Sequence, residues 1–318
     1  MARSPIVIIG SQRSEVGLPA GMAVLRGGGT ALDAVEAAMW RCEDNRDDHY
    51  VGTGGLPNAQ GVVELDASVM IGSSRAFGGV GAVRGYPHPI SIARAVLEQL
   101  PQHCLLVGEG AELFADEQGF KRAELLTEEA AQLFRTSLDG ATGDASDGEA
   151  GRVAPENEAY RSTALELVRR LAPHDGPWGT INVLALDADG ELVVGVSTSG
   201  FPWKYPGRVG DSAVPGAGIY CDARFGAAAC TGRGELTMRV TGARMVVDAL
   251  AMGADPVTSC RRMLEDAASI PDAFSSDVRA LCLTPDGRHG GASLRSGATY
   301  SAMTDHDAAP VILEAALA

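Results

Sequence analysis

The chain has 318 residues, of which 45% are hydrophobic and 21% are charged, as expected for a globular protein with a sizeable core. Its formal net charge of -15 argues against nucleic acids and anionic membranes as partners, because these polyanions would repel it. No run approaches the ~18 apolar residues of a membrane span, and the first residues lack the apolar core of a signal peptide. We therefore expect a cytoplasmic protein whose six cysteines are reduced thiols.

Short strands and amphipathic helices alternate in the first half of the chain. Thr30 is a suitable N-cap for a helix at residues 31–43, in which apolar residues recur at helical spacing. The run of glycines after Arg26 is a helix stop signal, and the pattern from Gly78 to Pro89 is turn-like. The expected strands are residues 6–9, 62–65 and 67–71, and the other expected helices are residues 18–25, 90–100, 109–117 and 127–137.

An acidic segment without periodicity, residues 139–158, is expected to be a flexible loop within a single domain. In the second half, Asp187-Ala-Asp-Gly190 is a hairpin turn between strands at residues 181–186 and 192–196. Because hairpins take the place of βαβ crossovers, the pattern favours antiparallel or mixed sheets flanked by helices. The remaining expected elements are helices at residues 159–171, 236–252 and 256–268, and strands at residues 278–283, 292–294, 298–303 and 311–315.

The bond between Gly179 and Thr180 is a candidate site of self-cleavage. A hydroxyl is a poor nucleophile unless a base lies beside it, and a free α-amine with a pKa of about 8 is such a base. We therefore hypothesise that the chain cuts itself before Thr180, which becomes the nucleophile of an amidohydrolase. Gly179 would tolerate the strained backbone that an N-to-O acyl shift needs. By itself, Gly-Thr is also a common start of a strand after a turn.

Further residues with suitable chemistry follow Thr180. Counted back from the hairpin turn, Thr198 in the segment STSG lies beside Thr180, where its hydroxyl could support the nucleophile. Arg208 and Asp211 suit an α-carboxylate and an α-amine on one small substrate, although a local salt bridge between them is an equal alternative. Thr231-Gly232 approaches a helix N-terminus and could form an oxyanion hole or only a helix cap.

These motifs resemble those of the glycosylasparaginase and plant-type (type 2) asparaginase family, which are N-terminal nucleophile (Ntn) hydrolases. The resemblance covers nearly the whole chain, with the motifs in the same order and at similar spacing. In the second half they are Thr180, STSG at 197–200, GRVGDS at 207–212, PGAG at 215–218 and GAAACTGRGE at 226–235. In the first half they are GGGTALDAVEAA at 27–38, VGTGGLPN at 51–58, ELDASVM at 64–70 and LLVGEGAELFADEQGF at 105–120.

The resemblance implies an α+β fold, a four-layer αββα sandwich with mainly antiparallel sheets. It implies cleavage into an α chain, 1–179, and a β chain, 180–318, that stay together and form a homodimer. Thr180 resembles the nucleophile and Thr198 the threonine that supports it. Arg208 and Asp211 resemble the clamp on the substrate's α-carboxylate and α-amine. Thr231 and Gly232 resemble the oxyanion donors, with Gly232 also contacting substrate. No cofactor and no metal are expected.

Two positions differ from the glycosylasparaginase pattern, in which His-Asp directly precedes the nucleophile. Here Gly-Pro-Trp-Gly separates His174-Asp175 from Thr180, and the immediate Gly-Thr is more like the isoaspartyl peptidase branch. Ser11-Gln12-Arg13 replaces a Trp-Asn pair that contacts substrate in glycosylasparaginases. The expected substrate is therefore an asparagine derivative, either free or N-glycosylated asparagine, or a β-aspartyl peptide. The alternative of another class is an unprocessed, non-catalytic binder of aspartate-like ligands.

Overall fold

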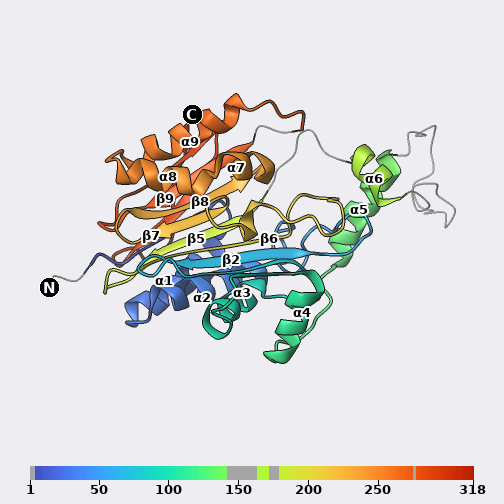
Figure 1. Ribbon diagram of the computed structural model, residues 1–318, viewed down its shortest axis with the longest axis horizontal. Coiled ribbons are helices and arrows are strands. Elements are labelled where there is room, and N and C mark those ends of the chain that lie inside the picture. Colours follow the sequence, from blue (N-terminus) through green and yellow to red (C-terminus); the bar gives the residue numbers. More distant parts are fainter. Residues whose placement is uncertain (1–3, 142–162, 172–178, 275–276) are drawn as a thin grey trace.

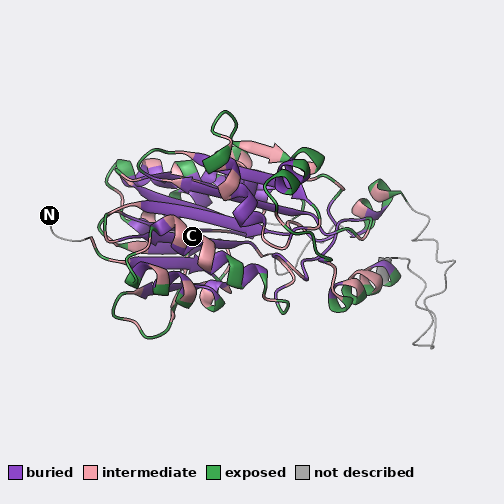
Figure 2. Cartoon of the chain, turned by 90° about the horizontal axis from the view of Figure 1, so that it is seen from below, coloured by how far each residue is buried: buried purple, intermediate pink, exposed green. Residues whose placement is uncertain are grey.

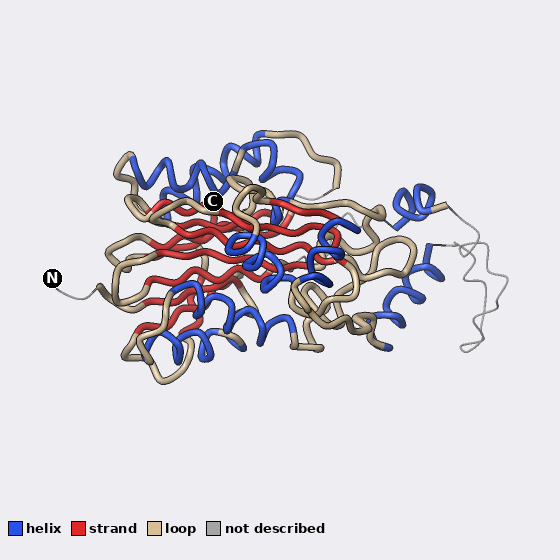
Figure 3. The backbone as a smooth tube through the Cα atoms, turned by 60° about the horizontal axis from the view of Figure 1, so that its bottom comes forward, coloured by secondary structure: helices blue, strands red, loops and turns tan. Residues whose placement is uncertain are grey.

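Two β-sheets lie face to face at the centre of the molecule, with helices on their outer sides (Figures 1 and 3). The computed structural model describes residues 4–141, 163–171, 179–274 and 277–318. Within these residues the strands are β1 (Val7–Ser11), β2 (Leu65–Ile71), β3 (Phe77–Val83), β4 (Leu105–Val107), β5 (Ile181–Leu186), β6 (Leu192–Thr198), β7 (Ile219–Asp222), β8 (Gly226–Gly232), β9 (Val278–Leu283), β10 (His289–Ser293), β11 (Thr299–Thr304), β12 (Val311–Glu314) and β13 (Ala316–Leu317).

Both sheets are mainly antiparallel, as the hairpin-rich sequence predicted. The larger has the order β12-β11-β1-β5-β6-β2-β3-β4, and the smaller has the order β13-β10-β9-β8-β7. Among the described strand pairs, only β3–β4 and β10–β13 are parallel. The central position of β5 in the larger sheet places Thr180, which directly precedes this strand, inside the molecule rather than at an edge.

The alternation of side chains along each strand builds two faces of the core. Along β5, Val183 and Ala185 belong to the same outer core cluster as residues of α1 (Leu18–Arg26) and α2 (Ala31–Glu43), whereas Leu184 belongs to the core between the two sheets. α3 (Pro89–Gln99) also packs on the larger sheet, while α8 (Gly242–Ala251) and α9 (Pro256–Ser269) cover the smaller one. Because central strands such as β5 and β6 are buried on both faces, their sequences are nearly continuous apolar runs. Figure 2 shows the strands of the sheets as buried.

Several helices begin and end where the sequence predicted. α2 matches its predicted bounds, and the Thr30 hydroxyl caps it by accepting from Asp33 N at 3.1 Å. α3 and α9 lie within a residue of their expected bounds, and α4 (Gly108–Glu117) and α5 (Glu128–Ala141) are also present. None of the helices that the structure describes is long and apolar enough to cross a membrane.

The turn-like interpretation of the segment from Gly78 to Pro89 was wrong for its first part, which is the end of strand β3 (Phe77–Val83), whereas residues 84–88 are irregular, as predicted. The glycines of β3 serve close packing. A Cβ at Gly78 would lie 2.2 Å from Ala93 O in α3, and a Cβ at Gly81 would lie 2.9 Å from the Val209 side chain. Glycine here lets a helix and a loop approach the two faces of the strand, which the sequence pattern alone did not distinguish from a turn.

Other boundaries also differ from the prediction. The strand expected at 67–71 is part of β2, which begins at Leu65 and has a register shift between Leu65 and Ala67, whereas residues 62–64 of the strand expected at 62–65 are not in a strand. The helix expected at 236–252 is divided into α7 (Gly234–Val240) and α8 by Thr241, whose φ is 51°. β7 and β8 were not predicted, because β7 is only four residues long and the small residues of β8 carry little strand signal.

Some predictions fall on residues that the structure does not describe. Only the first three residues of the predicted acidic loop 139–158 are described, and they form the end of α5. The helix predicted at 159–171 is described from residue 163 onwards, where α6 (Ala164–Leu171) lies. His174-Asp175 lies outside the described residues.

Candidate active site

The β5–β6 hairpin brings Thr198 to Thr180. Its register pairs Ile181 with Ser197, so the residue before β5 and the last residue of β6 become neighbours. The two hydroxyls lie 3.3 Å apart, with the Thr180 hydroxyl donating to Thr198 Oγ1. Both side chains are buried, at 8% and 2% exposure. The proximity predicted by counting residues back from the turn is therefore present in the fold.

The hydroxyl of Thr198 contacts both ends of the Gly179-Thr180 peptide. It accepts from Thr180 Oγ1 and lies 3.2 Å from Gly179 O, to which it can donate. Gly200 N donates to Thr198 Oγ1 at 2.9 Å, and this hydrogen bond fixes the position of the Thr198 hydroxyl. The Thr198 hydroxyl therefore accepts a hydrogen bond from the candidate nucleophile and donates one toward the carbonyl that self-cleavage would attack.

Packing, rather than an unusual backbone conformation, requires glycine at position 179. Gly179 is not among the described residues with positive φ, so the expectation of a strained backbone there has no support from its φ. A Cβ at this position would instead lie 2.6 Å from Cβ and Cγ of Tyr50. Tyr50 therefore packs directly against Gly179, and a larger residue at position 179 would displace the bond that self-cleavage would break.

The side chains of Ser11 and Asn182, to which the sequence assigned no role in the site, hold the start of β5. The Ser11 hydroxyl donates to Thr180 O at 2.9 Å and accepts from Asn182 N at 3.0 Å. The Asn182 side-chain amide donates to Thr231 Oγ1 at 2.5 Å and to Cys230 O at 3.1 Å. Because Asn182 donates to the Thr231 oxygen, the Thr231 hydroxyl hydrogen can donate to another group, and in this structure it donates to Thr180 O at 3.5 Å.

Thr231 and Gly232 end β8 rather than cap a helix. The N-cap of α7 is Arg233, which makes no side-chain capping bond, so the capping alternative for Thr231 was wrong. Thr231 Oγ1 lies 3.5 Å from Thr180 O. Gly232 has a φ of 112°, and a Cβ there would lie 2.0 Å from Asp277 O, so this position admits only glycine.

Arg208 and Asp211 lie in a loop at one side of Thr180 and do not form the local salt bridge that was the alternative. Arg208 donates instead to Glu235 Oε1, from Nη2 at 2.9 Å and Nε at 3.1 Å. Asp211 is buried and accepts from the Thr237 hydroxyl at 2.7 Å. The two charged groups therefore have separate partners, and both border the same small cavity.

Two acidic residues, Glu64 just before β2 and Asp66 within it, hold the loop that carries Arg208 and Asp211. The sequence did not indicate a role for either of them. The buried Asp66 carboxylate accepts from Gly210 N at 3.1 Å. The Glu64 carboxylate accepts from Gly207 N, and its backbone carbonyl accepts from Lys204 Nζ at 3.0 Å. Burial lowers the pKa of Lys204, against the opposing effect of Asp66. These contacts fix Arg208 and Asp211 relative to Thr180.

Burial raises the pKa of Asp211 to about 6, although the Thr237 hydrogen bond and Arg208 oppose this change. A protonated carboxyl cannot pair with an α-ammonium group. We therefore expect L-aspartate to bind more weakly as the pH falls through 6. Its dissociation constant should be about tenfold higher at pH 5 than at pH 7.

Calorimetric titration of aspartate from pH 5 to 8 would measure this effect, with Asp211→Asn as the matched variant. The variant should bind weakly at every pH and show no transition near 6. If wild type and variant showed the same transition, Asp211 would have no role in binding the α-ammonium group.

Thr180 lies where two cavities meet. The smaller, of about 20 Å³, contains the charged pair and is lined by Thr180, Thr198, Arg208, Asp211, Gly232 and neighbouring backbone. The larger, of about 270 Å³, borders Thr180 and Thr231 on the other side. Gly179 borders both. The charged pair thus lies on one side of Thr180, and the larger space lies on the other.

His49 makes no metal site with its neighbours. Its Nδ1 lies 2.9 Å from Gly54 O. Within the parts of the chain that the structure describes, no group of three or more His, Cys, Asp or Glu side chains could hold a metal ion.

Comparisons with known proteins agree over most of the chain. A family model described as asparaginase matches residues 13–313. The chain is 34% identical over 283 residues to N(4)-(Beta-N-acetylglucosaminyl)-L-asparaginase from Elizabethkingia miricola, covering 87% of this chain and 75% of that protein. It is 34% identical over 277 residues to the Mus musculus protein of the same name, covering 84% and 78%. It is also 34% identical over 266 residues to isoaspartyl peptidase/L-asparaginase from Mus musculus, covering 82% and 70%.

Proposed function

The chain belongs to the asparaginase family, and from that premise we propose that it is a self-processing amidohydrolase that releases aspartate from an asparagine derivative. Thr180 is the nucleophile and carries a β-aspartyl ester during turnover. The observation that carries the proposal is the position of Thr198, whose hydroxyl contacts both Thr180 Oγ1 and Gly179 O. One hydroxyl thus serves the candidate nucleophile and the bond that must break to activate it.

Self-cleavage begins when Thr180 Oγ attacks the carbonyl carbon of Gly179. The hydroxyl proton is transferred to the departing nitrogen as the C–N bond breaks, and an ester joins Gly179 to the Thr180 side chain. Water then hydrolyses the ester to a carboxylate on Gly179 and a free α-amine on Thr180. Thr198 donates to the carbonyl oxygen while charge develops on it, and Tyr50 holds Gly179 against this hydroxyl. The products are the chains 1–179 and 180–318.

Hydrolysis of the substrate uses the new α-amine as the base. It takes the hydroxyl proton as Thr180 Oγ attacks the side-chain amide carbon, and the leaving amine departs with that proton. Water then cleaves the β-aspartyl ester and regenerates Thr180 with release of aspartate. Arg208 binds the α-carboxylate, which replaces Glu235 as its partner, and Asp211 binds the α-ammonium.

Thr231 and the backbone of Gly232 stabilise the oxyanion. Asn182 orients the Thr231 hydroxyl by donating to its oxygen. Thr231→Ala should lower kcat on the order of a hundredfold, because one preorganised oxyanion donor contributes ~3 kcal/mol. Steady-state kinetics on the processed enzyme would measure this, with Thr231→Ser as the variant that keeps the donor. A kcat of Thr231→Ala within twofold of wild type would exclude this role.

Aspartate release tests the proposed function directly. Asparagine, a β-aspartyl dipeptide and a glycosylated asparagine share the aspartyl end that Arg208 and Asp211 would bind and differ only in the leaving group. Release from at least one substrate, dependent on Thr180, is the expected result. Binding of aspartate without release from any of the three would favour the non-catalytic binder instead.

We propose in addition that the whole chain forms one four-layer αββα domain of the Ntn-hydrolase type. The order of packing supports this: α1 and α2 contact the larger sheet, the sheets contact each other through residues such as Leu184 and Ala229, and α8 and α9 contact the smaller sheet. A homodimer of processed protomers in the cytoplasm, without cofactor, completes the proposal. Size-exclusion chromatography with light scattering would measure the assembly.

A further inference from the structure

Trp203 adopts a backbone conformation that usually requires glycine. Lys204 N donates to Phe201 O at 3.2 Å and closes a turn in which Pro202 and Trp203 are the central residues. The φ of Trp203 is 59°. Turns that need a positive φ at their third residue, such as type II turns, normally have glycine or asparagine there. A tryptophan at this position costs conformational free energy, so its other contacts must outweigh that cost.

An apolar cluster behind the turn holds the indole ring of Trp203. The residue is only 8% exposed, and its ring centre lies 5.2 Å from that of Phe134 in α5. Leu56 and Leu138 belong to the same cluster, together with apolar residues of α6. Trp203 N also donates to Pro57 O at 3.0 Å. These contacts stabilise the strained turn, and the aromatic pair is the part of them that α5 supplies.

Both ends of the turn are connected to the smaller cavity beside Thr180. Phe201, the first residue of the turn, lines this cavity together with Arg208. At the other end of the turn, Lys204 Nζ donates to Glu64 O at 3.0 Å. The Glu64 carboxylate accepts from the backbone N–H directly before Arg208. A displacement of the turn would therefore move two of the side chains that line the cavity.

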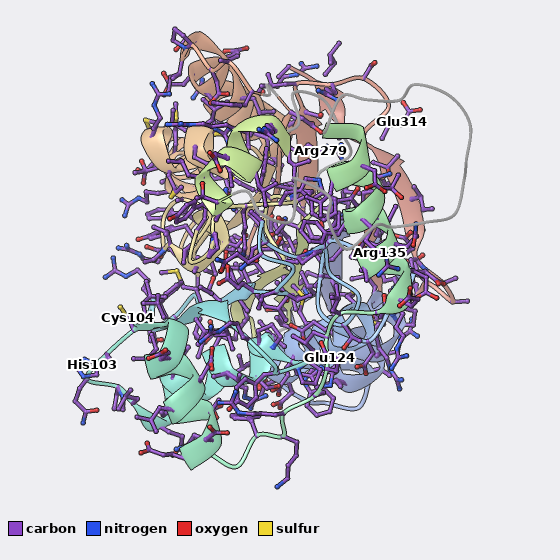
Figure 4. All side chains as sticks on the ribbon, turned by 90° about the vertical axis from the view of Figure 1, so that its right-hand side faces the viewer. His103, Cys104, Glu124, Arg135, Arg279 and Glu314 are labelled. Carbon is purple, nitrogen blue, oxygen red and sulfur yellow. The ribbon has the colours of Figure 1, made fainter. Side chains whose placement is uncertain are left out.

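α5 lies beside one end of the two sheets instead of covering a face of either (Figures 1 and 4). Figure 4 looks onto this end of the molecule, with Arg135 of α5 labelled. The cluster that joins α5 to Trp203 includes no residue of a described strand. Phe134 precedes the proposed cut before Thr180, whereas Trp203 follows it, so their contact would join the two products. α5 therefore supports the loop after β6 rather than the core of a sheet.

From these contacts we propose that Trp203 is a positioning residue for substrate binding and that Phe134 of α5 holds it in place. The inference rests on the proposed function, since it takes Arg208 as the group that binds the substrate's α-carboxylate. Among the described residues that line the two cavities beside Thr180, neither Phe134 nor Trp203 occurs. Both therefore act through the turn, by fixing Phe201 and Arg208 before the substrate arrives.

Phe134→Ala tests the inference on the processed enzyme. KM for aspartate release and the dissociation constant for L-aspartate should both rise about 3- to 10-fold, the size expected for loss of one aromatic pair, while kcat stays near that of the wild type. A purely structural role would lower the folded fraction, and so the apparent kcat, without changing KM. No release by the wild type from asparagine, a β-aspartyl dipeptide or a glycosylated asparagine would instead contradict the proposed function.

Leu133→Ala is the matched control on the same helix, because Leu133 is 44% exposed and lies outside the apolar cluster. It removes a side chain of similar apolar character and should keep the wild-type KM and dissociation constant. An unchanged KM in Phe134→Ala, or an equal rise in Leu133→Ala, would overturn the inference.

Two milder variants decide the matter if Phe134→Ala does not fold. Phe134→Leu keeps most of the apolar volume and should raise KM about threefold. Trp203→Gly suits the positive φ but removes the ring, so KM should rise about 3- to 10-fold although the backbone strain is relieved. Because Phe134 acts through Trp203, the double variant should have the same KM as Trp203→Gly alone. A wild-type KM in either single variant, or multiplied effects in the double variant, would contradict the inference.

Discussion

Thr180→Ala is expected to yield a single uncut chain of 318 residues without amidohydrolase activity. The substitution removes the only atom proposed to attack Gly179 C, and without cleavage no α-amine forms at residue 180. Both processing and turnover therefore fail together. The loss should be roughly 10⁶-fold, the size of effect that removal of a hydroxyl nucleophile has in a serine protease. A denaturing gel and an assay of aspartate release would measure the two consequences.

Thr180→Ser is the matched variant, because it keeps the hydroxyl and loses only a methyl group. It should be processed, more slowly than wild type, and retain measurable activity. The Thr180 side chain is buried, so circular dichroism and thermal unfolding would establish that both variants fold. Normal cleavage of the Thr180→Ala chain would contradict the assignment of the nucleophile.

Arg208→Gln is expected to separate processing from substrate binding. The Arg208 side chain is only 19% exposed and borders the small cavity, so the variant loses the proposed partner of the substrate carboxylate. KM should rise between about 30-fold and 5,000-fold, since truncation of one member of a buried charge pair costs about 2–5 kcal/mol. Self-cleavage should continue, because Arg208 donates to Glu235, whereas Thr198 is the residue that donates to Gly179 O. Steady-state kinetics together with a gel would measure both.

Arg244→Gln controls for the loss of a positive charge. Arg244 pairs with Asp248 on the surface of α8, with 47% of each side chain exposed. Its KM should match that of the wild type. If Arg208→Gln also kept a wild-type KM, Arg208 would have no part in binding the carboxylate.

Local signals predicted the parts of the fold that depend on neighbouring residues. The cap at Thr30 and the hairpin turn after Leu186 are short-range features, and counting from that turn placed Thr198 beside Thr180. By contrast, the glycines of β3 were mistaken for a turn, because their reason is close contact with α3 and with Val209. Composition alone does not distinguish these two uses of glycine.

Long-range pairing explains what the sequence did not reveal about the site. Ser11 reaches Thr180 O only because β1 lies beside β5 in the sheet, 169 residues away in the chain. The partner of Arg208 is likewise Glu235 of α7 rather than nearby Asp211. The sequence was sufficient to recognise side chains with suitable chemistry. Their hydrogen-bond and ion-pair partners became known only from the folded structure.

The intact masses of the purified wild-type chain test self-activation at Thr180 most directly. Mass spectrometry under denaturing conditions should detect two products, residues 1–179 and 180–318, and sequencing of the second should begin at Thr180. The two masses should sum to that of the full chain plus one water. A single mass of the full 318-residue chain, in a preparation that nevertheless releases aspartate, would contradict the proposed nucleophile and its activation.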